Sequence, residues 1–108
     1  MTGKMVRSAF WIGAPRAGQE EAFATAIDDE LVPAMRRFPG VSAVRALWPV
    51  TREDCPPAIH CQVIVEFASP QDMARMLASS ERAALRPRVK AAVALFDGTI
   101  SHIDYRAV

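Results

Sequence analysis

Residues 59–67 constrain the fold of this 108-residue chain more than any other stretch, because their side chains alternate strictly. The sequence there is IHCQVIVEF, and an extended chain sends successive side chains to opposite faces. One face is apolar and the other is mixed: Cys61, Val63, Val65 and Phe67 against His60, Gln62, Ile64 and Glu66. This pattern predicts a strand whose apolar face lies in the core.

A helix is predicted directly after this strand, in the run ASPQDMARMLAS. Ser69 is a suitable N-cap, Pro70 fits the first helical position, and Asp72 lies three residues after the cap. A second cap, at Ser79 or Ser80, predicts that helix resumes after a short break.

The remaining C-terminal residues predict the end of that helix and a last strand. Pro87 lies inside the helical run and should interrupt it, because proline removes a backbone hydrogen bond. Asp97-Gly98 is a typical turn pair, so we expect the chain to turn there into a strand formed by TISHIDYRAV.

The N-terminal half predicts the same order of elements. Residues 4–13 are rich in Val, Phe, Trp and Ile and predict a strand. Apolar residues then recur at steps of three and four, which predicts a helix: Ala22, Phe23, Ala26, Ile27, Leu31, Ala34, Met35 and Phe38. Pro33 should kink or break this helix near residue 32. After the Pro39-Gly40 turn, residues 41–50 predict a second strand.

The resulting order, βαββαβ, predicts an α+β fold of the ferredoxin-like type. Two helical crossovers and one short connection between the second and third strands give a four-stranded antiparallel sheet with helices on one face. The length suits a single domain over residues 1–108, with residues 1–4 flexible.

Composition excludes several classes of function. Thirteen Lys and Arg against twelve Asp and Glu leave a net charge of +1, so the chain has no basic excess for nucleic acid. No apolar stretch approaches the ~20 residues that span a bilayer, and the first residues lack the pattern of a secretory signal. We therefore expect a cytoplasmic protein with neither a nucleic-acid nor a membrane partner.

The two cysteines, Cys55 and Cys61, are too few for a disulfide scaffold, and their C-x5-C spacing is no recognised metal box. We expect reduced thiols, with Cys61 buried in its strand and no metal bound. A disulfide or a metal site is the alternative.

The face of the sheet without helices predicts a homodimer. A solvent-facing sheet would be more uniformly polar than this mixed face, which could meet its own copy across a twofold axis. By alternation we assign Met5, Arg7, Ala9 and Trp11 to this face. The residues expected at the interface are Arg45, His60, Gln62, Ile64, Glu66, His102 and Asp104.

Four titratable residues are candidate catalytic groups, each with a structural alternative. His60 could act as a general base or could bond across the interface. His102 could form an oriented pair with Asp104, or the two could make a structural ion pair. Glu30 borders the apolar helix stripe and could be partly buried, or it could be an ordinary exposed glutamate. Tyr105 could donate to a substrate carbonyl, although an amphipathic strand also explains it.

Several runs in their order resemble the EthD-like family, named for ethyl tert-butyl ether degradation, within the dimeric α/β-barrel superfamily. They are VPAMRRFPGV, the strand IHCQVIVEF, FASPQDMARMLAS and the terminal LFDGTISHIDYRAV. The resemblance implies a ferredoxin-like protomer whose sheet packs on a second copy. It also implies a pocket for small apolar metabolites between helices and sheet. We expect that pocket to be lined by Ile27, Leu31, Met35, Val63, Val65, Phe67, Met76 and Phe96.

The family pattern often has a histidine two residues before the proline that matches Pro33, and Leu31 stands there in this chain. Leucine cannot transfer protons, so the family's acid/base chemistry does not carry over at this position. The resemblance implies no cofactor. Two functions follow: binding and cofactor-free oxygenation, isomerisation or cyclisation of a small hydrophobic or aromatic metabolite, or a non-catalytic accessory or ligand-binding dimer.

Overall fold

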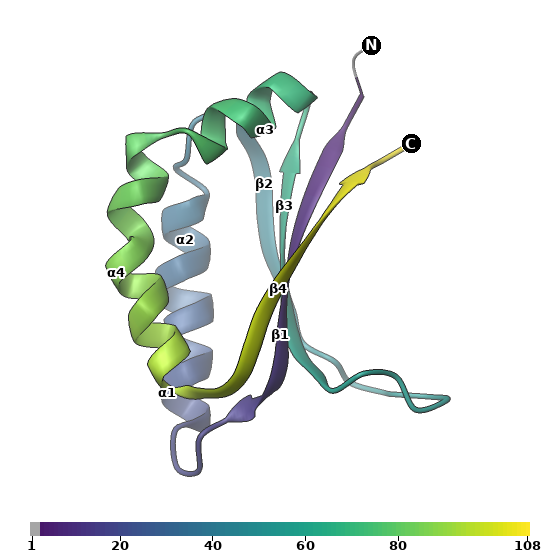
Figure 1. Cartoon of the computed structure of the whole chain (residues 1–108), viewed down its shortest axis with the longest axis vertical. Helices are drawn as coiled ribbons and strands as arrows, with labels where there is room; N and C mark the ends of the chain where they lie inside the picture. Colours follow the sequence, from purple (N-terminus) through teal and green to yellow (C-terminus); the bar gives the residue numbers. More distant parts are fainter. Residues whose placement is uncertain (1–2) are drawn as a thin grey trace.

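The computed structural model describes residues 3–108 and contains four strands and a set of helices in the predicted order (Figure 1). The strands are β1 (Met5–Pro15), β2 (Val41–Leu47), β3 (Ile59–Phe67) and β4 (Phe96–Arg106). The helices are α1 (Glu20–Thr25), the π-helical segment η1 (Ala26–Leu31), α2 (Val32–Met35), α3 (Pro70–Leu77) and α4 (Ser80–Ala94).

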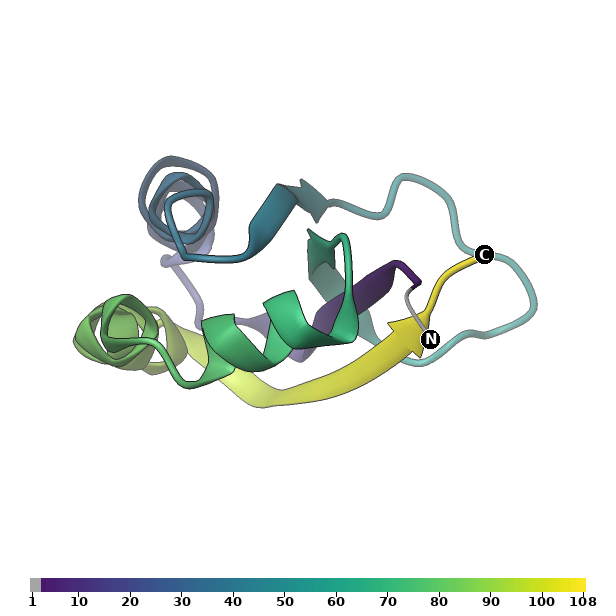
Figure 2. The same cartoon turned by 90° about the horizontal axis from the view of Figure 1, so that it is seen from above.

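The strands form one antiparallel sheet in the order β2-β3-β1-β4. All of the helices lie on one side of this sheet, and the view from above shows α4 beside the continuous α1–η1–α2 segment (Figures 1 and 2). The predicted α+β, βαββαβ fold is therefore confirmed. Within residues 3–108, no helix has the length and apolar character needed to cross a membrane.

Residues 1 and 2, part of the segment expected to be flexible, lie outside the described residues. Lys4, in the same segment, accepts a hydrogen bond on its backbone oxygen from the N–H of Ala107 at 2.9 Å. The beginning of β1 and the end of β4 are thus held together.

Pro33 disturbs its helix in a specific way. The backbone N–H of Val32 donates to the oxygen of Ile27, five residues earlier, and η1 is π-helical as far as Leu31. Proline cannot donate and its ring crowds the carbonyl four residues before it, so a wider turn ahead of Pro33 relieves both problems. The break predicted near residue 32 is therefore absent, and the effect of Pro33 is a π-helical turn within a continuous helix.

The predicted helix caps are present. Ser69 Oγ accepts from the N–H of Asp72, and Ser79 Oγ accepts from the N–H of Arg82, each at 3.1 Å. The interruption predicted at Pro87 is wrong, since α4 runs unbroken through that residue. Both Pro87 and Ala83, whose carbonyl loses its usual donor, are exposed, so water can satisfy that group.

The turn predicted at Asp97-Gly98 is also wrong, because β4 already begins at Phe96. Gly98 pairs with Gly13 of β1, and both glycines have positive φ angles. A Cβ atom on Gly13 would collide with the backbone oxygen of Asp97, and one on Gly98 with that of Ile12. The glycine pair extends the β1–β4 ladder where the sequence suggested a turn.

The alternation of β3 is confirmed on its apolar side, but the assignment of β1 to the uncovered face is wrong. Cys61, Val63 and Val65 are buried under the helices, and their register partners are Trp11, Ala9 and Arg7. Opposed residues in a sheet share a face. The first strand therefore turns Arg7, Ala9 and Trp11 toward the helices, and β4 follows it through the pairs Trp11–Ile100, Ala9–His102 and Arg7–Asp104.

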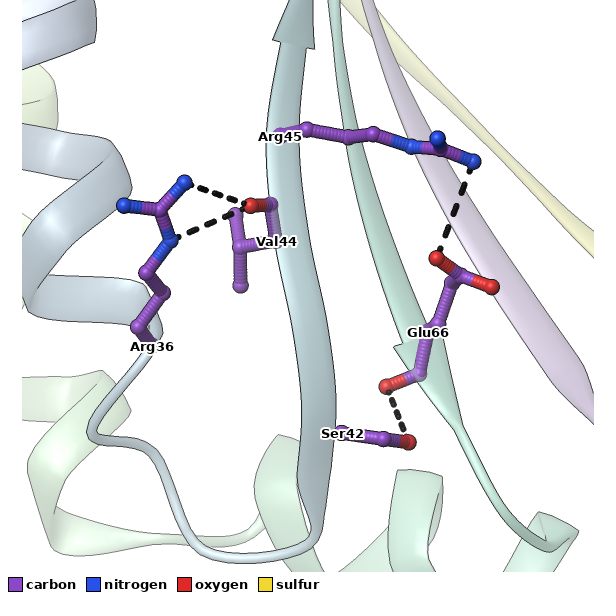
Figure 3. A network of polar contacts seen from close by, with 5 residues as sticks. All are labelled: Arg36, Ser42, Val44, Arg45 and Glu66. Atoms are coloured by element: carbon purple, nitrogen blue, oxygen red, sulfur yellow. Dashed lines mark hydrogen bonds and ion pairs between the residues drawn. The ribbon is translucent and has the colours of Figure 1, made fainter.

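The edge strand β2 is anchored from both sides (Figure 3). Arg36, on the side away from β3, donates from Nε and Nη2 to the oxygen of Val44 at 3.2 and 3.0 Å. On the other side, Ser42 donates to the oxygen of Glu66 at 3.1 Å, and Arg45 lies 3.7 Å from the Glu66 carboxylate. The guanidinium of Arg36 occupies a carbonyl that an exposed sheet edge would otherwise offer to another chain.

Candidate functional site

A cavity of about 200 Å³ lies between the helices and the sheet. Strands β1, β3 and β4 supply one wall, and the helical segments supply the other. Eleven of its fifteen lining residues are apolar: Ala9, Trp11, Leu31, Met35, Phe38, Val63, Val65, Met76, Leu85, Val89 and Ile100. The other four carry basic side chains: Arg7, Arg82, Arg86 and His102. The combination is an apolar chamber with basic groups and no acidic lining residue.

Two of the basic groups come from the sheet. Arg7 Nη1 donates to both carboxylate oxygens of Asp104, at 2.9 and 3.1 Å. This pair neutralises the half-buried guanidinium, which would be costly to leave without a partner charge. The prediction that His102 pairs with Asp104 is wrong, because the Asp104 carboxylate binds Arg7 instead.

His102 lies beside Arg7 in this cavity. His102 is exposed as a whole residue, but the partial burial of its imidazole lowers the pKa, the positive charges of Arg7 and Arg82 lower it further, and Asp104 opposes them. His102 is therefore largely uncharged at neutral pH, and an uncharged imidazole can accept a proton. It is the one group lining this cavity that can take up a proton near neutral pH.

The other two basic groups, Arg82 and Arg86, come from α4. They are four residues apart and therefore lie on one face of the helix, with Leu85 and Val89 alongside. Arg82 Nη1 donates to the oxygen of Leu77 at 3.3 Å, and Arg86 is exposed. These two arginines and Arg7 were not predicted from the sequence to line the pocket. The spacing of residues 82, 85, 86 and 89 could have indicated a single face of α4 that combines charge with apolar side chains.

The eight residues expected to line a pocket divide into two groups. Leu31, Met35, Val63, Val65 and Met76 lie in the cavity wall. Ile27, Phe67 and Phe96 are instead buried in the core and do not line the cavity, which corrects the expectation for these three.

His60 lies away from the cavity, in an aromatic cluster at the other end of the helix–sheet interface. Its ring centroid is 5.6 Å from Phe23, 5.8 Å from Trp48 and 6.0 Å from Phe96. The register between β1 and β3 shifts here, since Trp11 pairs with Cys61 and Ile12 with Ile59, which leaves His60 without a partner. Such a bulge re-aims a side chain. The assignment of His60 to the uncovered face is therefore wrong.

The surroundings of half-buried His60 and buried Cys61 favour the uncharged forms of both side chains. Burial lowers the pKa of His60, as does the charge of Arg52. Burial raises the pKa of the Cys61 thiol to about 12, with a smaller contribution from the charge of Asp28. Asp28 itself accepts a hydrogen bond from the Trp48 indole at 3.1 Å. Cys61 is thus a packing residue, as predicted, and it and the exposed Cys55 are both free.

Glu30 and Tyr105 do not reach the cavity either. Glu30 is exposed and borders a separate groove between α1, η1 and α4. Tyr105 is 43% exposed and pairs with Val6, on the sheet face without helices. Of the four candidate catalytic residues, only His102 lines the cavity.

The residues predicted at the dimer interface lie on two different faces of the sheet. Arg45, Gln62, Ile64 and Glu66 lie on the sheet face without helices, as their register shows, whereas His102 and Asp104 lie on the helix-covered face with Arg7. The assignment of His102 and Asp104 to the interface is therefore wrong. Within residues 3–108, no three His, Cys, Asp or Glu side chains converge in a way that could hold a metal ion.

Comparison with known proteins identifies the fold. No protein-family model and no curated protein matches the chain. Among solved structures, an ethyl tert-butyl ether degradation (EthD) family protein from Bacillus halodurans matches with a TM-score of 0.70 at 12% identity, covering 100% of both chains. A DABB family protein with a ferredoxin-like fold from Mesorhizobium loti matches with a TM-score of 0.65 at 18% identity, covering 98% of both chains.

A variant of SnoaB, a cofactor-independent oxygenase from Streptomyces nogalater, has a TM-score of 0.59 at 21% identity, and the match covers 98% of this chain and 92% of that one. The fold implied by the resemblance to EthD-like proteins is therefore confirmed. At these identities the likeness extends to the fold, and the function must be argued from the site.

Proposed function

We propose that this chain binds a small hydrophobic or aromatic metabolite in the cavity between helices and sheet. The observation that carries the proposal is a hollow of about 200 Å³ with eleven apolar lining residues. Protein interiors are otherwise close-packed, and an apolar cavity of ~150 Å³ is large enough to take benzene. Met35 and Met76 add flexible side chains that can adjust to the shape of a ligand.

Binding of a neutral aromatic probe tests this proposal. We expect naphthalene-2-carboxamide to bind in a one-to-one ratio by isothermal titration calorimetry. Ala9→Phe places a ring in the cavity and should abolish binding, whereas Ala84→Phe, on the exposed side of α4, should not. A lack of binding to the wild-type protein, or equal binding to the Ala9→Phe variant, would overturn the proposal.

The position of His102 favours a second function, cofactor-free transformation of the bound molecule by proton transfer. Its lowered pKa keeps the imidazole ready to accept a proton from a carbon next to a carbonyl. The probe is 2-acetylnaphthalene, whose methyl protons exchange with deuterium from solvent through the enolate.

We expect the protein to accelerate this exchange, as followed by NMR, and His102→Gln to remove the acceleration. His60→Gln, in the aromatic cluster, should retain it. Unchanged exchange in the His102→Gln variant would contradict the role of His102 and leave binding as the function of the cavity.

We also propose that the sheet face without helices packs on a second copy of this chain. This face exposes large apolar side chains, with Leu47 41%, Ile103 48% and Tyr105 43% exposed, next to the complementary pair Arg45 and Glu66. Exposed apolar surface of this kind is typical of an interface. No helix of the described residues covers this face, because all of them lie on the opposite side of the sheet (Figure 1).

Light scattering during size-exclusion chromatography tests the second copy. The wild-type protein should have twice the chain mass of 11.8 kDa. The double variant Leu47→Glu, Ile103→Lys should have the mass of one chain and remain folded by circular dichroism. A wild-type protein with the mass of one chain would refute the dimer.

A further inference from the structure

We propose that the ligand of the cavity is an organic acid whose single carboxylate is held by Arg82 and Arg86 while its hydrophobic body lies in the apolar chamber. This inference rests on the proposed binding function and adds the chemical class of the ligand. It concerns two arginines of α4 that line the cavity.

Arg82 and Arg86 lie on the side of α4 that borders the cavity. Arg82 and Arg86 both line the cavity, on the same face of α4 as the apolar residues Leu85 and Val89. The α4 helix runs alongside the sheet with the α1–η1–α2 segment next to it (Figures 1 and 2). A ligand whose apolar part contacts Leu85 would therefore have both guanidinium groups within one helical turn of it, and one that reaches Val89 would still have Arg86 within a turn.

The charges around the cavity are not balanced. The ion pairs found within residues 3–108 are Arg7–Asp104, Arg45–Glu66 and Arg75–Asp72. Arg7 thus has its own carboxylate, whereas Arg82 and Arg86 are in none of these pairs. Since no acidic side chain lines the cavity, its basic groups outnumber its acidic ones even when Asp104 is counted.

The side chains of Arg82 and Arg86 also have hydrogen-bond donors available for a ligand. A guanidinium has five N–H donors in a planar fork that matches the two oxygens of a carboxylate. Arg82 uses one nitrogen on the oxygen of Leu77 at 3.3 Å. Two arginines four residues apart on one helix also repel each other, and a bound carboxylate would reverse that cost.

The titration of His102 is consistent with this reasoning. The charges of Arg7 and Arg82 both lower its pKa, so their positive potential extends to the sheet wall of the cavity. An anion between α4 and β4 would lie in that potential.

The experiment compares two probes that differ in charge and hardly in shape. Naphthalene-2-carboxylate and naphthalene-2-carboxamide are titrated separately into the full chain by calorimetry. We expect the carboxylate to bind at least about tenfold more tightly, since hydrogen bonds between charged groups are stronger than those to a neutral amide. Arg86→Gln and Arg82→Gln should each reduce carboxylate affinity toward that of the carboxamide, and leave carboxamide affinity unchanged.

Lys90→Gln is the matched control, because it removes one positive charge from an exposed position of α4 that does not line the cavity. It should leave both affinities within about twofold of wild type, since exposed charges are screened by salt. Arg86 is itself exposed, so its substitution should not prevent folding even if that of Arg82, which bonds Leu77, does.

The outcomes separate the two claims. Equal affinity for both probes would overturn the acid ligand and leave the apolar binding function standing. A carboxylate preference that survives both arginine substitutions, or that Lys90→Gln also removes, would likewise overturn the assignment to Arg82 and Arg86. If neither probe binds, both the proposed function and this inference are overturned.

Discussion

The two ends of the helix–sheet interface have the same layers but opposite packing. At one end, the rings of Trp11, Phe23, Trp48, His60 and Phe96 form a continuous cluster with centroid separations of 5.0 to 6.2 Å. At the other end, aliphatic and methionine side chains enclose a cavity of about 200 Å³. Trp11 belongs to both ends and forms the boundary between them.

Each end contains one histidine, and burial is the main reason that both have lowered pKa values. His60 is surrounded by rings, so its environment explains it as a packing group. His102 stands against a hollow with Arg7 and Arg82 nearby. The comparison teaches that a shifted pKa alone does not identify a functional histidine, and that the space in front of the imidazole does.

The largest effect that would test this contrast is the loss of a ring at the packed end. Phe23 is fully buried and contacts four other rings, so Phe23→Ala should lower the free energy of unfolding by ~3–5 kcal/mol. Ile100→Val at the half-buried cavity wall should cost about 1 kcal/mol. Urea denaturation measures both values. A loss for Phe23→Ala well below this range would mean that the aromatic cluster is not tightly packed.

Adding side-chain volume should also change the free energy of unfolding differently at the two ends, by less than the loss of a ring does. Cys61 is fully buried beside the aromatic cluster, so Cys61→Leu should cost ~1–3 kcal/mol through overpacking. Ala9→Val adds volume into the hollow on a strand, where a β-branched residue is favoured, and should cost much less or stabilise the protein. A large cost for Ala9→Val would mean that the cavity wall has no free space.

The smallest expected effect is a dependence of stability on pH. Both histidines have folded-state pKa values below the ordinary value of ~6.5, so the unfolded chain takes up protons first as the pH falls. The free energy of unfolding should therefore have its full value above about pH 6.5 and decrease as the pH falls below it. Arg52 faces His60, and Arg7, Arg82 and Asp104 face His102.

Thermal unfolding between about pH 7.5 and pH 5.5 measures this decrease above the range in which most carboxyl groups titrate. The double variant His60→Gln, His102→Gln should show a flatter profile than wild type. An identical profile would mean that neither imidazole is desolvated in the folded protein.

The sequence predicted the order of elements and the covered face of β3, because local signals there agree with one another. The cap at Ser69 and the alternation in residues 59–67 are such signals. It could not orient β1, since Ala9 and Trp11 on one face compete with Phe10 and Ile12 on the other. Only the register with β3 decides between them.

The candidate site depended on that same register and was therefore predicted only in part. Leu31 and Met35 followed from helical periodicity and do line the cavity. The direction of His60 depends on a bulge with no clear local signal, and that of His102 depends on its pairing with Ala9. The roles of Arg82 and Arg86 require a cavity in front of α4, which is a tertiary feature.

One measurement tests the central claim, that a ligand enters the cavity, most directly. Methyl-labelled methionine gives separate NMR signals for Met35 and Met76, which line the cavity, and for Met5 and Met73, which do not. Titration with naphthalene-2-carboxylate should shift the signals of Met35 and Met76 and leave those of Met5 and Met73 in place. Shifts confined to Met5 or Met73, or no shift at all, would contradict the claim.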